Sequence, residues 1–99
     1  MFELKFTKTA DRQLKIIEES PSQAGLVRQI KKSLGYLQTN PRHSSLNTHP
    51  YGSIYHPFDP KGKVFEAYAQ NNAPSSYRIF WCYGPDKKQI TIIAITSHP

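Results

Sequence analysis

The sequence has little cysteine, few acidic side chains and no long apolar run. Cys82 is the only cysteine in the 99 residues, so no intrachain disulfide can form, which suits a reducing compartment. No apolar run reaches the roughly 20 residues that a membrane-spanning helix needs. The N-terminal segment, residues 1–6, is too short and too highly charged to be a signal peptide. We therefore expect a cytoplasmic protein that does not contact a membrane.

The shortage of acids leaves the chain strongly basic. Thirteen Lys and Arg residues face seven Asp and Glu residues, which gives a formal charge of +6 and a pI near 9.6. Residues 1–42 hold 8 basic and 4 acidic side chains, and residues 43–99 hold 5 and 3. An evenly spread excess favours an anionic partner, either nucleic acid or an acidic protein, over a basic tail. Many soluble proteins carry such a charge without binding a polyanion, so charge alone does not identify the partner.

The first half of the chain predicts a strand and two helices. Residues 2–6 alternate apolar and charged side chains, which is typical of a half-buried strand. Residues 8–19 carry one apolar stripe at helical spacing behind Thr7 or Thr9 as a cap, and residues 22–40 carry another. The link between these two segments is short, so we expect an antiparallel helical hairpin.

The second half predicts a long connection followed by strands. Residues 41–63 contain four prolines, two glycines and three of the four histidines, and they show no regular period. Strands are expected at 64–70, 77–83 and 89–96, with turns at 71–75 and 84–86. The expected fold is α+β, in the order β-α-α-β-β-β, with the helical hairpin packed on one face of a four-stranded antiparallel sheet. A chain of this length supports one core, so residues 1–99 form a single expected domain.

Four short segments are informative through their order and spacing along the chain: Asn40-Pro41-Arg42-His43, Val64-Phe65-Glu66-Ala67-Tyr68, Tyr77-Arg78-Ile79-Phe80-Trp81 and Ile95-Thr96-Ser97-His98-Pro99. Together with the element order, length and charge, they resemble the RelE/ParE toxin superfamily, and within it a RelE-like group. The resemblance implies the toxin of a type II toxin–antitoxin pair. It implies either a ribosome-dependent endoribonuclease that cleaves messenger RNA without a metal or cofactor, or a ParE-like inhibitor of DNA gyrase. An orphan relative that only binds a partner is a further alternative, because fold does not fix function.

RNA cleavage without a metal needs a base for the 2′-hydroxyl proton, a cation for the phosphorane charge and an acid for the leaving oxygen. Arg78 is the candidate cation, on the sheet face that the helices leave open; its alternative role is an ion pair with Glu66. Glu66 is either the general base or that structural partner. His98 is the candidate acid or base because imidazole titrates near neutral pH, and its alternative is a frayed terminal residue. The resemblance supports all three, and we expect Arg78 and His98 to lie side by side.

Further residues are candidate RNA contacts. Tyr68 could stack on an unpaired base, whereas Trp81 is expected in the core. The spacing of the histidines and Cys82 matches no common zinc pattern, so we expect no metal site, and Cys82 is expected to be a small residue of the core or of a sheet face. A cognate antitoxin, small and acidic, is the expected protein partner, with messenger RNA and the ribosome as targets. The candidate phosphate contacts are Arg42, Lys61, Lys63, Lys87 and Lys88.

Overall fold

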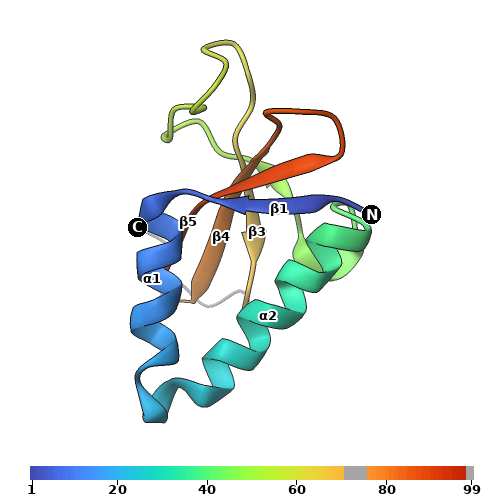
Figure 1. Ribbon diagram of the computed structural model, residues 1–99. Helices are drawn as coiled ribbons and strands as arrows, with labels where there is room; N and C mark the ends of the chain where they lie inside the picture. Colours follow the sequence, from blue (N-terminus) through green and yellow to red (C-terminus); the bar gives the residue numbers. More distant parts are fainter. Residues whose placement is uncertain (71–75, 98–99) are drawn as a thin grey trace.

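The computed structural model describes residues 1–70 and 76–97; the expected turn at 71–75 and the candidate residue His98 lie outside the described residues. The elements follow the order strand, two helices, then strands (Figure 1). Short 3-10 turns precede α2 and follow it. The elements are β1 (Glu3–Phe6), α1 (Lys8–Glu18), η1 (Pro21–Gln23), α2 (Ala24–Thr39), η2 (Ser44–Leu46), β2 (His49–Pro50), β3 (Phe65–Tyr68), β4 (Tyr77–Tyr83) and β5 (Gln89–Ser97).

The sheet has five strands in the order β1-β5-β4-β3-β2, and it is mixed. The expectation of four antiparallel strands is therefore corrected in two respects. β1 pairs parallel with β5, because the helices rather than a tight turn connect β1 to the rest of the sheet. β2 is a two-residue strand inside the expected loop, and it pairs antiparallel with β3. The α+β class and the packing of both helices on the sheet are confirmed.

Thr7 fixes where α1 begins. Its side-chain oxygen accepts a hydrogen bond from the Ala10 backbone N–H, which makes Thr7 the N-cap. The same hydroxyl donates to the Ile93 carbonyl at 2.7 Å, so the cap also connects α1 to β5. The start of the helix and its attachment to the sheet therefore depend on one side chain.

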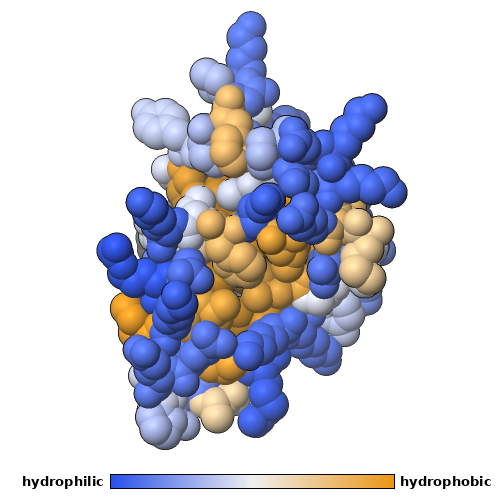
Figure 2. Space-filling view, viewed as in Figure 1, coloured by the Kyte–Doolittle hydropathy of each residue, from blue (hydrophilic) through white to orange (hydrophobic). Residues whose placement is uncertain are grey.

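The core lies between the two helices and one face of the sheet. Ile30 and Leu37 of α2 are completely buried, as are Ile79 of β4 and Ile92 of β5. Trp81 is 1% exposed in the same cluster, which confirms its expected place in the core. α1 and α2 meet at one end and diverge across the sheet (Figure 1). Apolar side chains gather between them, and hydrophilic side chains surround that area (Figure 2).

The other face of the sheet is covered partly by the segment after α2. Tyr51 donates its backbone N–H to the Val64 carbonyl, and its ring lies 4.8 Å from the ring of Phe80, centroid to centroid. Among the described residues, no helix is both long and apolar enough to span a membrane.

Candidate functional site

β3 and β4 place three of the sequence-predicted site residues on the sheet face opposite the helices. Tyr68 is paired with Arg78 across the two strands, and Glu66 with Phe80. Because side chains alternate along a strand, Ile79 points into the helical core and Arg78 points away from it. Arg78 therefore lies on the expected sheet face, opposite the helices, but its side chain is buried there.

The Arg78 guanidinium is buried beneath the ring of Tyr68. Its Cζ lies 4.0 Å from the centroid of that ring, and the residue is only 3% exposed. Its Nε lies 3.9 Å from Oε2 of Glu66, and Nη1 donates to the Tyr77 carbonyl at 3.3 Å. The expectation of an open guanidinium is therefore wrong. The Glu66 carboxylate, the Tyr77 carbonyl and the Tyr68 ring together offset the cost of burying this charge.

Glu66 joins Arg78 to a histidine from the segment after α2. Its Oε1 lies 2.6 Å from Nε2 of His49, and the carboxylate side chain is 2% exposed. β2 brings the two together, because His49 and Glu66 are direct partners in the β2–β3 ladder. His49, Glu66, Tyr68 and Arg78 form one connected group, which we name the Arg78 cluster.

Both ring nitrogens of His49 lie beside oxygen atoms. Nδ1 lies 2.8 Å from the Asn47 carbonyl oxygen, and Nε2 lies 2.6 Å from Oε1 of Glu66. The His49 side chain is 43% exposed, so the imidazole connects the buried carboxylate to solvent.

Sequence reasoning missed His49 as a member of this group and weighed it only as a metal ligand. β2 is two residues long and lies in a segment where apolar and polar side chains show no regular spacing. No sequence pattern therefore indicates which residue His49 faces. The resemblance covered Glu66 and Arg78 but not the connection between η2 and β3. Only the β2–β3 register identifies the histidine.

The candidate phosphate contacts lie outside the Arg78 cluster, and His98 lies outside the described residues. β5 is described as far as Ser97, so the expected neighbourhood of His98 and Arg78 stays a prediction. The five candidate phosphate contacts are all exposed and lie in three places: before η2, before β3 and in the turn between β4 and β5. They are Arg42, Lys61, Lys63, Lys87 and Lys88.

Cys82 and the histidines are engaged in local structure. Cys82 is completely buried, and burial raises the pKa of its thiol to about 11. His43 Nδ1 accepts from the Ser45 N–H, and His56 Nδ1 accepts from the Phe58 N–H. In the part of the chain that is described, no three His, Cys, Asp or Glu side chains gather where they could hold a metal ion.

Solved structures of toxins match the chain over almost its whole length. A YoeB/ParE toxin from Agrobacterium tumefaciens superposes with a TM-score of 0.73 at 11% identity, covering 99% of this chain and 100% of that one. YafQ from E. coli gives 0.66 at 13% identity, covering 98% and 93%. RelE in the archaeal RelE–RelB complex from Pyrococcus horikoshii gives 0.63 at 15% identity, covering 97% and 93%. No protein-family model and no curated protein sequence matches the chain. The structural matches and the sequence pattern agree: this chain has the fold of the RelE/ParE toxin superfamily.

Proposed function

We propose that this protein is the toxin of a type II toxin–antitoxin system and acts as a ribosome-dependent endoribonuclease on messenger RNA. The observation that carries the proposal is the Arg78 cluster on a toxin fold. A guanidinium, a carboxyl–imidazole pair and an aromatic ring lie within contact of one another on the sheet face that no helix covers. The basic charge of +6 supports a polyanionic substrate.

The chemistry needs one proton removed and one delivered. The ribose 2′-oxygen attacks the adjacent phosphorus and gives its proton to a base. The 5′-oxygen then leaves with a proton from an acid, so a cyclic phosphate and a free hydroxyl remain. Glu66 is the candidate base, directly or through His49, and His98 is the candidate acid.

Arg78 would stabilise the phosphorane charge once its guanidinium is uncovered. Tyr68 lies over the guanidinium and is itself half-buried, so its ring is the candidate group to move when the cation is uncovered. A ring that leaves Arg78 can stack on an unpaired base, which is the role that the sequence predicts for Tyr68. We therefore propose that substrate binding exchanges the Arg78–Tyr68 contact for a Tyr68–base contact and an Arg78–phosphate contact.

The test is induction of the protein in cells with mapping of messenger RNA ends. New ends should accumulate with the wild type and with Arg12→Ala, an exposed control on α1, but not with Arg78→Lys. Lysine keeps the charge beside Glu66 and loses the planar fork of donors, so folding is preserved better than with alanine. Unaltered messages and translation on induction of the wild type would reject the nuclease proposal.

A second candidate function is favoured by the burial of the same residues. Arg78 and Glu66 are 3% and 2% exposed and are paired with each other, which suits a structural ion pair. In that case the protein is a binding module, either a ParE-like gyrase inhibitor or an orphan that only binds a partner. DNA breaks and filamentous cells with intact messages would identify the gyrase inhibitor.

Both functions include a small acidic antitoxin as the partner. The apolar area between α1 and α2 is open to solvent, and hydrophilic side chains border it (Figure 2). An amphipathic segment with acidic flanks would bury its apolar side chains there and pair its charges with the surrounding cations. A gene for a small acidic protein beside this one would support the proposal.

A further inference from the structure

A row of cations and rings lies along α2, outside the Arg78 cluster. Arg28, Lys32 and Tyr36 are spaced by four residues, so they follow one side of the helix at successive turns. The Tyr36 ring stacks on His43, with centroids 3.9 Å apart and planes at 14°. Arg42 precedes His43 and is exposed. We name this row the α2 strip: Arg28, Lys32, Tyr36, Arg42 and His43.

The α2 strip carries uncompensated positive charge. No Asp or Glu occurs between Glu19 and Asp59, so neither α2 nor the segment after it contributes an acid. Lys31 pairs with Glu18 of α1 at 3.2 Å. Within the described ranges no ion pair involves a cation of the strip. On α1, by contrast, Lys15 is paired with Asp11 at 3.0 Å.

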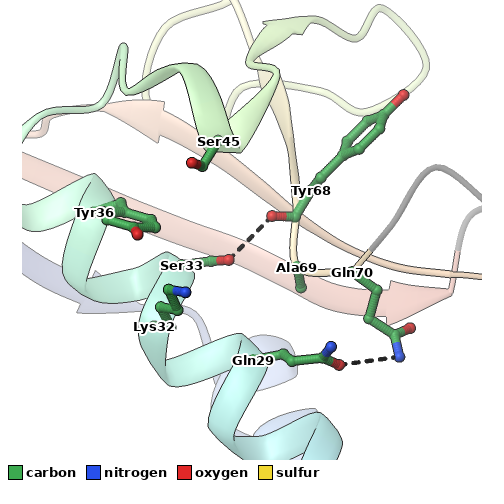
Figure 3. A pocket seen from close by; sticks show the side chains of 8 residues that line it. All are labelled: Gln29, Lys32, Ser33, Tyr36, Ser45, Tyr68, Ala69 and Gln70. Atoms are coloured by element: carbon green, nitrogen blue, oxygen red, sulfur yellow. Dashed lines mark hydrogen bonds between the residues drawn. The ribbon is translucent and has the colours of Figure 1, made fainter.

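Lys32 lines two neighbouring hollows, and one of them is polar. This hollow, of about 200 Å³, lies between α2 and the end of β3, and its rim includes Ser33, Ser45 and Tyr36 (Figure 3). The second hollow continues along α2 past Arg28. The Lys32 ammonium lies 6.0 Å from the Tyr36 ring centroid. A cation, the Ser45 hydroxyl and an aromatic pair therefore lie together at this hollow, where the buried Ser33 hydroxyl donates to the Tyr68 carbonyl (Figure 3).

These groups correspond to the parts of a nucleotide chain. Exposed cations at successive helical turns attract phosphates, hydroxyls can bond to ribose, and an aromatic pair offers a face to a base. We propose that the α2 strip is a second RNA-binding surface, which holds the phosphate backbone of an RNA strand outside the Arg78 cluster. The inference rests on the proposed action on RNA and adds the surface that positions the RNA.

The experiment measures binding of a fluorescent single-stranded RNA in which every ribose is 2′-O-methylated. This probe lacks the nucleophile, so binding is read without cleavage. The test variant is Arg28→Glu with Lys32→Glu, and the matched control is Lys8→Glu with Arg12→Glu on α1. Both pairs are exposed, are spaced by one helical turn and change the net charge equally. We expect the strip variant to weaken binding at least tenfold and the control less than threefold. The slope of log K against log salt should fall by about 1.4 in the strip variant, because two phosphate contacts are lost.

Equal losses in both variants, no loss in either variant, or a wild type that does not bind the probe would each overturn the inference. The first would mean that binding follows net charge alone. Loss of binding to an acidic peptide with unchanged RNA binding would also overturn it and would assign the strip to a protein partner. A wild type that binds the probe through the strip but cleaves no message in cells would reject the nuclease function and leave the strip intact.

Discussion

Glu66 connects two side chains that are far apart in the sequence, His49 and Arg78, and it is almost completely buried. Glu66→Gln should lower the free energy of unfolding by about 3–5 kcal/mol, because it leaves the Arg78 charge buried without its partner. Urea denaturation measures the loss. In a double-mutant cycle, Glu66→Gln with Arg78→Met should cost much less than the sum of the single changes. Additive costs would show that the two groups do not interact.

The Cys82 thiol should make the free energy of unfolding depend on pH. Burial raises the pKa of its thiol to about 11, from 9.0 for an unperturbed thiol. Between these values the unfolded chain releases a proton that the folded chain keeps, so stability falls as pH rises through that window. The loss should reach about 2 kcal/mol near the upper end. Urea denaturation at a series of pH values, with Cys82→Ala as the control, should show a shallower decline in the variant; parallel curves would contradict the assignment.

At the scale of elements, the cap of α1 can be tested by two substitutions. Thr7→Ala should cost about 1–2 kcal/mol, because it removes both the bond from the Ala10 N–H and the bond to the Ile93 carbonyl. Thr7→Ser keeps the hydroxyl and should retain most of the stability. Thermal unfolding with circular dichroism separates the two variants, and equal losses would show that the methyl group rather than the hydroxyl matters.

Helices and strands whose apolar side chains recur at a regular spacing were predictable from the sequence. Features that depend on which strands pair with each other were not. The apolar stripe with Ala10 and Ile17 indicated α1, and the run from Tyr77 to Tyr83 indicated β4, both close to their observed bounds. The parallel pairing of β1 was not predictable, because a strand pattern does not encode its neighbour. β2 is too short to show a period. For the candidate site, Glu66, Tyr68 and Arg78 were proposed from the residues and the resemblance. The burial of Arg78 was not predictable, because it depends on the Tyr68 ring and the Glu66 carboxylate that the fold brings against it.

For the whole molecule, the apolar area between α1 and α2 predicts where an antitoxin docks. Val27 of α2 is half-buried and packs against the core, whereas Ile16 is 58% exposed among the polar side chains of α1. Val27→Asp should weaken binding of the proposed acidic antitoxin at least tenfold, since a carboxylate would be desolvated against acidic flanks. Ile16→Asp is the matched control. Calorimetric titration measures both, and equal affinities would place the antitoxin elsewhere.

The strand order has a consequence for synthesis of the protein. β5 lies between β1 and β4, although it is the last of the five strands in the sequence. While the chain is being translated, β1 and the two helices emerge without the strand against which they pack, so the sheet cannot close until β5 has left the ribosome. The packing of β1 and of the helical hairpin therefore depends on the strand that is synthesised last of the five.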